Sequence, residues 1–329
     1  MVVNDYNIHI DNYVTIVIID DGLKGKEWKA LEQNPEANVD IIGFVTKTSS
    51  GSIKYITNPD DSYLNQQLSW GHGFAVISAL AAVARDVKVI FMDIDMGADP
   101  YGFEKGEYLM WWWIYTYQAS KDIDIVSWSQ STDIHFAYPG SQTQQLWSLL
   151  INKGVIMLAS AGNLGTYKNL NVTTEVEWKY PQYYTAWYAI GSIDHETRSG
   201  DNSNKNHRTY YSSWYESYTS GNHIVNWLEP GHGVPVLTDP KQVGSIFKGT
   251  WVYGNGTSIS APYLAAIIAL IITGYHNGIG SSTDPSVQKV IEILLYASSR
   301  STFYQLTGYG YVDAYIAYGK AYMEGRLAA

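Results

Sequence analysis

Cysteine is absent from this 329-residue chain, which excludes disulfides, thiolate metal sites and cysteine nucleophiles. Basic residues are scarce as well, because 21 Lys and Arg stand against 31 Asp and Glu, a formal net charge of -10. No basic block is long enough to follow a phosphate backbone, so we expect no nucleic-acid partner. The first residues lack the pattern of a secretory signal, and the apolar runs at 109–117 and 263–272 are shorter than a membrane span. We therefore expect no membrane-spanning segment.

Aromatic residues are abundant instead, with 28 Tyr and 12 Trp, many of them in polar stretches such as 209–220. Such rings suit ordered surface loops, or a groove that grips an extended peptide or sugar. We expect the loop role, and keep a carbohydrate-binding surface as an alternative that only composition supports. The 46% hydrophobic and 16% charged residues suit one large compact domain.

Short apolar runs alternate with helical patterns along the chain. The runs predict strands buried on both faces, at 13–19, 87–92, 123–128, 154–160 and 186–193. The longer patterns predict helices at 72–84, 106–120, 141–154, 258–274 and 285–298. This alternation predicts an α/β fold with a doubly wound, mainly parallel sheet and helices on both faces. We expect a single domain over 1–329, with long loops at 165–250 and neither a prodomain nor a C-terminal domain evident.

Polar clusters follow three of the predicted strands, at Asp20-Asp21, at 129–131 and at 160–163. In a parallel sheet, catalytic groups collect at the carboxyl ends of the strands. The stretch GNGTSISAP, residues 254–262, brings Ser258 to the start of an apolar helix. There Ser258 is either a nucleophile or a helix-capping serine.

A serine nucleophile requires an imidazole that takes its proton and a carboxylate that orients the imidazole. Among the histidines, His72 opens a predicted helix within Gly-His-Gly, and Asp20 ends a wholly apolar strand. The remaining histidines include several in polar loop sequence, where we expect solvated side chains (for example His195, His207, His223 and His232). No histidine pair has the spacing of a metal site.

Asp20, His72, Asn163 and Ser258, in this order and each in its own motif, resemble the subtilisin-like serine proteases, the subtilase family. IIDDG resembles the family's Asp motif in the Asp-Asp-Gly form of the kexin and furin branch, and GHGFAV resembles its His-Gly-Thr motif. VIMLASAGN resembles the strand that carries the oxyanion Asn, and GTSISAP the nucleophile motif Gly-Thr-Ser-x-x-x-Pro. IDIVSWSQS, EPG at 229–231 and GYGYVDAYIA extend the resemblance over nearly the whole chain.

The resemblance implies a serine endopeptidase that cleaves proteins or peptides through an acyl-enzyme. In it, Asp20 orients the imidazole, His72 is the general base and then the general acid, and Ser258 is the nucleophile. Asn163 donates to the oxyanion beside the Ser258 backbone N–H. The implied walls of the substrate pocket are Ser129, Gln130, Ser131, Ser160, Ala161 and Gly162. Asp21 implies a preference for a basic substrate residue, or else it holds the loop.

Phe74 departs from the family pattern, because a Thr is usual two residues after the catalytic His. The ring either shifts the His72 helix or fills space left by another change. Further departures lie on the nucleophile helix, at Ile259, Ser260, Tyr263 and Ala265. These departures keep open the alternative of a catalytically inactive binding or structural protein.

No cofactor is required for the implied chemistry, and the loop that carries the tight calcium site of bacterial subtilisins is missing. Asp93, Asp95 and Asp99 hold a different cation or form a solvated acidic loop, and we expect the loop. A separate propeptide or inhibitor is an expected partner besides the substrate. A secreted or cell-surface location is favoured, although a cytoplasmic one is also compatible with the sequence.

Overall fold

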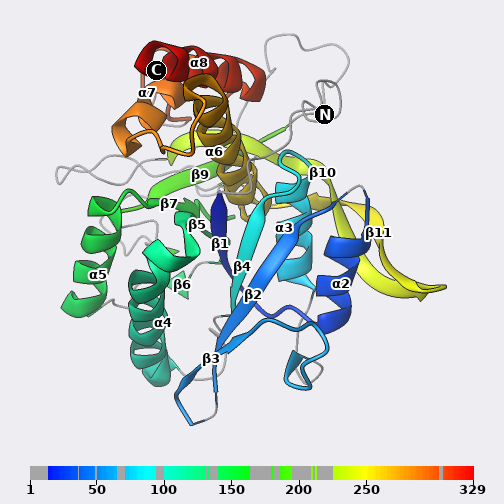
Figure 1. Ribbon diagram of the computed structural model, residues 1–329. Coiled ribbons are helices and arrows are strands. Elements are labelled where there is room, and N and C mark those ends of the chain that lie inside the picture. The colour runs from blue at the N-terminus through cyan, green and yellow to red at the C-terminus, as the bar shows by residue number, and fades with distance from the viewer. Residues whose placement is uncertain are drawn as a thin grey trace, which may run out of the picture.

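The computed structural model describes residues 14–35, 37–48, 50–64, 71–93, 100–130, 132–133, 140–163, 179–180, 186–194, 209, 212, 225–303 and 307–329. Its centre is a nine-stranded sheet with the order β11-β10-β9-β7-β5-β1-β4-β2-β3 (Figure 1). The neighbouring strands are parallel except for β2–β3 and β10–β11, the antiparallel pairs at the two edges. The predicted fold class, an α/β fold with a mainly parallel sheet, is confirmed.

The strands have the following bounds: β1 (Thr15–Asp20), β2 (Asp40–Lys47), β3 (Ile53–Ile56), β4 (Lys88–Asp93), β5 (Ile123–Trp128), β7 (Ile156–Ser160), β9 (Tyr188–Asp194), β10 (Val225–Val243) and β11 (Ile246–Asn255). Two short strands, β6 (Thr132–Asp133) and β8 (Lys179–Tyr180), pair separately. In β1 the side chains alternate between two hydrophobic cores, Ile16 and Ile18 in one, Val17 and Ile19 in the other. Both faces are therefore buried, which is why the sequence of β1 is a solid apolar run.

Helices cover both faces of the sheet (Figure 1). One core contains residues of α2 (Gly25–Gln33), α3 (His72–Ala81), α6 (Thr257–Ile279), α7 (Val287–Ala297) and α8 (Ala314–Ala328). The other contains residues of α4 (Pro100–Lys121) and α5 (Ser141–Asn152). The apolar run at 263–272 is shorter than a membrane span, but the helix that contains it, α6, is long and apolar enough to cross a membrane. Of its most apolar window, 89% is buried inside the fold, so here α6 is a core helix.

The five predicted helices and the five predicted strands are all present, with ends shifted by a few residues. The expected loops at 165–250 are wrong for 225–250, because β10 and β11 form a long antiparallel hairpin there. Two register shifts interrupt β10, after His232 and after Thr238, and they break the alternation that normally marks a strand. Most of 164–224 lies outside the described residues.

Candidate active site

The polar clusters predicted from the sequence lie where parallel strands end. β1 ends at Asp20, Ser129 follows β5, and Asn163 follows β7 by three residues. β1, β5 and β7 are parallel neighbours in the sheet, so these residues share its carboxyl edge.

Asp20 and His72 are in direct contact. The Nδ1 atom of His72 lies 2.6 Å from Oδ1 of Asp20, which also accepts the backbone N–H of Asp21 at 2.6 Å. Asp20 is fully buried, whereas 41% of the His72 side chain is exposed. A carboxylate at Nδ1 holds the ring proton there and leaves Nε2 as the basic atom.

Electrostatics favour the protonated form of His72. The Asp20 carboxylate raises the pKa of His72, partial burial opposes the increase, and the more distant Asp21 charge adds to it. Asp21 therefore acts on the imidazole through its charge, in addition to any part in the substrate pocket. That pocket role stays a prediction.

Gly73 allows α3 to begin close to the end of β1. A Cβ atom on Gly73 would lie 2.8 Å from the carbonyl oxygen of Gly22 and 2.6 Å from the Phe91 ring. Both distances are too short for any residue but glycine. The Gly after His72 is thus a packing requirement that brings the imidazole to Asp20.

Asn163 and Thr257 form a second pair beside Ser258. Oδ1 of Asn163 accepts both the backbone N–H and the hydroxyl of Thr257, each at 3.0 Å, and Oγ1 of Thr257 accepts the N–H of Gly162 at 3.0 Å. Because Oδ1 already has two donors, Nδ2 is the part of the Asn163 amide that is left to donate elsewhere. The sequence reading missed this role of Thr257, a buried neighbour of the nucleophile.

A small space beside Ser258 is bordered by two donors and one hydroxyl. A Cβ on Gly256 would stand 3.6 Å from Asn163 Nδ2, 3.8 Å from the Ser258 backbone N and 3.9 Å from Ser258 Oγ. Glycine at 256 therefore places no side chain among these three atoms. Two N–H donors around a point next to a hydroxyl are the arrangement that stabilises an oxyanion.

Ser129 joins the two halves of the site. Its backbone N–H donates to the carbonyl of Ile19, the residue before Asp20, at 3.2 Å. Its hydroxyl donates to the carbonyl of Ser258 at 2.8 Å. Ser129 is buried and tied to the framework, so its contacts differ from those of the simple pocket wall that the resemblance implied.

Three of the other implied pocket residues, Gln130, Ser160 and Ala161, lie at or just after the ends of β5 and β7. Ser160 and Ala161 are buried, and the Ala161 N–H donates to the carbonyl of Ile190 at 2.9 Å. Gln130 is partly exposed. Ser131 lies outside the described residues. Their contacts with substrate stay a prediction.

Residues 229–231, which the resemblance implied to be a turn, belong to β10 and bind the segment around the nucleophile. The carbonyl of Gly231 accepts the N–H of Gly256 at 2.7 Å, and the Ser260 hydroxyl donates to the carbonyl of Glu229 at 3.0 Å. Glu229 is buried, its side chain accepts the N–H of Val312 at 3.1 Å, and burial raises its pKa well above the ordinary value. Ser260, a departure from the family pattern, thus joins the nucleophile helix α6 to β10.

Phe74 packs in the core beneath the β10–β11 hairpin. It is fully buried, and a Cβ on Gly249 of β11 would lie 2.9 Å from its ring and 3.0 Å from Leu237. Of the two outcomes expected for Phe74, the ring fills space. The His72–Asp20 contact is made in its presence. Tyr263, another departure, is partly buried, and burial together with the Glu229 charge raises its pKa to about 12.

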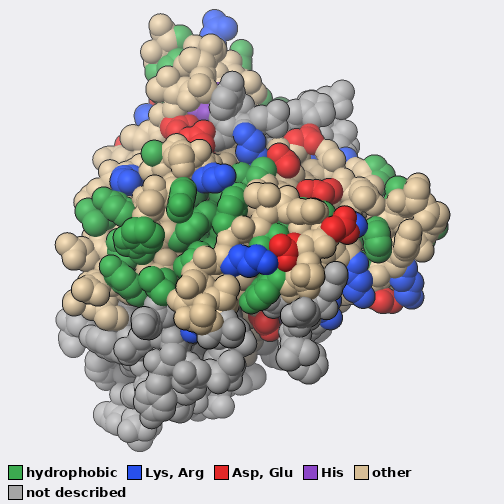
Figure 2. Space-filling view, turned by 60° about the horizontal axis from the view of Figure 1, so that its bottom comes forward, with side chains coloured by type: hydrophobic (Ala, Val, Ile, Leu, Met, Phe, Trp, Pro, Cys, Tyr) green, Lys and Arg blue, Asp and Glu red, His purple; other side chains and the backbone are tan. Residues whose placement is uncertain are grey.

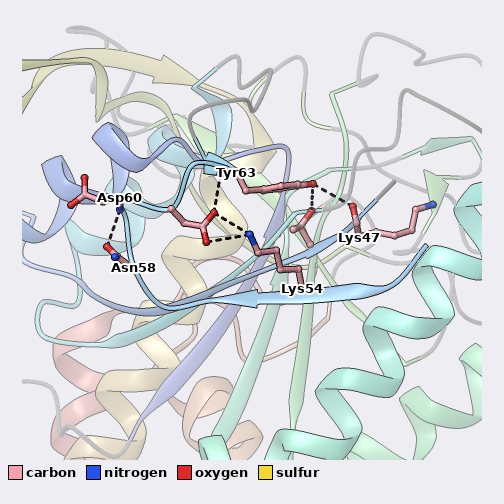
Figure 3. A network of polar contacts seen from close by, with 7 residues as sticks. Lys47, Lys54, Asn58, Asp60 and Tyr63 are labelled. Atoms are coloured by element: carbon pink, nitrogen blue, oxygen red, sulfur yellow. Dashed lines mark hydrogen bonds and ion pairs between the residues drawn. The ribbon is translucent and has the colours of Figure 1, made fainter. Parts of the chain in front are cut away.

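The solvated loop expected around Asp93 is wrong for that residue. Asp93 ends β4 and is buried, and its carboxylate accepts the Gly22 N–H at 3.0 Å and the Thr46 hydroxyl at 3.1 Å. Thr46 also contacts the hydroxyl of Tyr63, part of the polar network around Lys54 in Figure 3. Asp93 therefore fixes the turn after Asp20. Asp95 and Asp99 lie outside the described residues.

One acidic group among the described residues is compact enough to hold a metal ion. Carboxylate oxygens of Asp122, Asp124 and Asp284 lie within 4.8 Å of one another, at the amino ends of the strands and away from Ser258. Asp124 accepts the Thr15 N–H at 2.9 Å, and burial raises its pKa to about 8. Asp284 is bonded to the buried His276 at 2.8 Å. Asp124 and Asp284 thus each have a hydrogen-bond partner within the protein, Thr15 and His276.

Known proteins resemble this chain in sequence and in fold. The thermophilic serine proteinase of Bacillus sp. (strain AK1) is 25% identical over 163 residues, which are 50% of this chain and 31% of that protein. The chain thus spans about a third of the length of this relative.

Among solved structures, a lanthipeptide protease has a TM-score of 0.67 and 19% identity, with 96% of this chain and 90% of that chain covered. The prenylagaramide maturation protease PagA has a TM-score of 0.59 and 14% identity, over 95% and 94%. The self-cleaved protease domain of PatA has a TM-score of 0.58 and 18% identity, over 95% and 98%. These structures share the fold. The model of the subtilase family matches residues 11–311, most of the chain, including all four residues from which the site was built. The chain belongs to the subtilase family, a family of serine proteases.

Proposed function

We propose that the protein is a serine endopeptidase that works through Asp20, His72 and Ser258. The observation that carries the proposal is the pair of contacts at the sheet edge: His72 is bound to Asp20 at 2.6 Å, and Asn163 is oriented by Thr257 beside Ser258. A neutral imidazole held by a buried carboxylate, as His72 is by Asp20, can accept the proton of a hydroxyl. The Asn163 amide, whose oxygen already accepts bonds from Thr257, can donate through its nitrogen.

In the proposed reaction, Nε2 of His72 takes the proton of Ser258 as Oγ attacks the substrate carbonyl. The imidazolium is stabilised by the Asp20 carboxylate, and the oxyanion accepts from Asn163 Nδ2 and the Ser258 N–H. Collapse of the tetrahedral intermediate breaks the C–N bond, and His72 returns the proton to the leaving amine. Water then hydrolyses the acyl-enzyme by the same steps, with His72 again as the base.

The start of α6 assists the negative charge. Ser258 is the second residue of this 23-residue helix, so the oxyanion forms near the positive end of the helix dipole. Pro262 is the sixth residue of α6 and cannot donate to the carbonyl of Ser258 four residues earlier, which instead accepts the Ser129 hydroxyl at 2.8 Å. The helix start therefore supports the chemistry, and no cofactor is needed for any step.

We further propose proteins or peptides as substrates, supported by neighbours that are described as a lanthipeptide protease and a maturation protease. A separate propeptide or inhibitor belongs to this proposal as a partner of the same site. The inactive alternative rested on Phe74 and on the aromatic-rich loops, and most of 209–220 lies outside the described residues. Since the Phe74 ring packs in the core and the His72–Asp20 contact is intact, no described residue favours inactivity.

The test is covalent labelling with a fluorophosphonate, followed by turnover of casein and of a peptide library. We expect Ser258 to be labelled, and Ser258→Ala to lose both labelling and turnover while keeping its unfolding transition. A folded wild-type protein that neither labels nor cleaves any substrate would refute the proposal.

A further inference from the structure

The β10–β11 hairpin projects from the body of the protein (Figure 1). β11 is the edge strand of the nine-stranded sheet and pairs with β10 on one side. It ends at Asn255, three residues before Ser258, so its outer edge runs directly to the nucleophile. An edge strand of this kind is a template on which an extended peptide adds as a further strand.

α2 and α3 contact the distal half of the hairpin, the half nearer its turn. The Phe247 N–H donates to the Gln33 side chain at 2.8 Å, and the Lys29 ammonium stands 5.5 Å from the centre of the Phe247 ring. Phe74 packs beneath Gly249. Contacts from both α2 and α3 therefore fix the direction of β11, and a rigid strand is better suited to add a peptide than a mobile loop is.

One face of β11 is open along its length. Lys248, Thr250 and Val252 are exposed and share this face by alternation, and Tyr253 next to Val252 is 78% exposed. The end of the strand near Ser258 is thus apolar and aromatic, and the distal part is basic. A bound peptide would meet these two zones in that order.

The distal zone places two positive charges side by side. Lys241 of β10 is directly opposite Lys248 of β11 in the antiparallel register, and both are exposed. Like charges in such a pair destabilise the sheet. Asp239 offsets part of this through its ion pair with Lys241 at 2.8 Å, and it is the only exposed acidic residue of the hairpin, 225–255. Figure 2 shows basic side chains gathered at the edge of the molecule to which the hairpin extends.

We infer that β11 binds the part of an extended substrate that follows the scissile bond, and that Lys241 and Lys248 select acidic residues in it. The inference rests on the proposed function. Since β11 runs toward Ser258, a segment that starts at the bond and follows the strand outward is antiparallel to it. At about 3.3 Å per residue, its positions roughly seven to ten beyond the bond reach Lys248. The complementary partner is an acidic peptide, which has the same sign of charge as the whole protein (-10), so its attraction has to come from Lys241 and Lys248.

The experiment uses one peptide that the enzyme cleaves, extended after the cleavage site by tails of ten residues. The kcat/KM values for an acidic tail, a basic tail and a Gly-Ser tail are compared in the wild type and in the double variant Lys241→Glu/Lys248→Glu. The control is Lys153→Glu, which changes an exposed lysine next to α5, away from the hairpin. We expect the acidic tail to raise kcat/KM by about three- to tenfold over Gly-Ser, chiefly through KM. The double variant should prefer the basic tail, and the control should behave as wild type.

Backbone methylation separates strand addition from simple charge attraction. In a peptide added to a strand, every second backbone N–H donates to that strand. N-methyl groups on all odd positions of the tail, or on all even positions, should therefore weaken binding in one of the two peptides and not in the other. Equal cleavage of all three tails, an equal effect of Lys153→Glu, or methylation effects without alternation would each overturn the inference. If no tail helps but the short peptide is cleaved, the proposed function stands and only this inference fails.

Discussion

Replacing Asn163 by Asp and by Ala separates the two tasks of this side chain. In the structure Oδ1 accepts two bonds from Thr257, while Nδ2 borders the space beside Ser258. Asp keeps an acceptor for Thr257 but puts a negative charge where the donor was. Ala removes both the acceptor and the donor.

Both variants should lose activity. The loss of one oxyanion donor lowers kcat by about 10²–10³, or roughly 2.7–4 kcal/mol, a range taken from another subtilase. The kcat of Asn163→Asp should be lower than that of Asn163→Ala, because the introduced carboxylate would repel the oxyanion. KM should change little in either, since the interaction forms only as the negative charge develops.

Stability should follow the reverse order. Ala leaves the buried Thr257 N–H without its acceptor, which costs about 1–3 kcal/mol. Asp retains that bond and adds a negative charge at the start of α6, worth about 0.3–1 kcal/mol of stabilisation. Urea unfolding and steady-state kinetics on one peptide measure both orders. An Asn163→Asp protein with wild-type kcat, or an Asn163→Ala protein as stable as wild type, would refute this reasoning.

Four more predictions follow from the structure. Asp21→Asn removes a charge that raises the pKa of His72, so the acid limb of kcat/KM should move to lower pH, while an unmoved limb would show that the charge does not reach the ring. Phe74→Ala should cost about 3–5 kcal/mol in urea unfolding, because it empties the space under the hairpin; a cost below about 1 kcal/mol would contradict that packing. Gly231→Ala adds a Cβ that would stand 2.8 Å from the Gly256 carbonyl, and the displaced nucleophile turn should lower kcat by at least about tenfold, a loss that unchanged kinetics would disprove. The pKa of Asp124 is raised to about 8, so between roughly pH 4 and 8 the folded state binds a proton that the unfolded state does not. The free energy of unfolding should therefore fall as the pH rises through this range, by at most about 1.4 kcal/mol per pH unit. Unfolding of Asp124→Asn measured at several pH values should show a flatter dependence.

Much of the fold and of the candidate site could be read from local sequence. β1, β4 and β7 are buried on both faces, so each is largely an apolar run that ends at polar residues, whereas Asp124 and Ser127 interrupt the run of β5. Asp20 and His72 lie in short motifs in which packing also restricts the adjacent residues. At Gly73, for example, the surrounding atoms leave no room for a side chain. Those residues were recognisable because their signal lies within a few positions of the chain.

The hairpin was not recognisable in the same way. Register shifts break the alternation of β10, and exposed residues line β11, so neither has the pattern of a buried strand. The environment of Phe74 depends on this hairpin, more than 160 positions later in the chain. The sequence alone left the role of Phe74 open, and the position of the hairpin shows that its ring fills the space beneath Gly249.

The sequence by itself determined which chemical groups stand at the ends of the parallel strands, since burial on both faces fixes a local pattern and the sheet brings the strand ends to one edge. Only the tertiary structure decided how those groups are oriented. The bonds of Thr257 to Asn163 and of Ser129 to Ser258 join residues 94 and 129 positions apart. Such bonds follow from how α6 packs against the sheet, and packing depends on the summed volumes of many side chains, which no local pattern records.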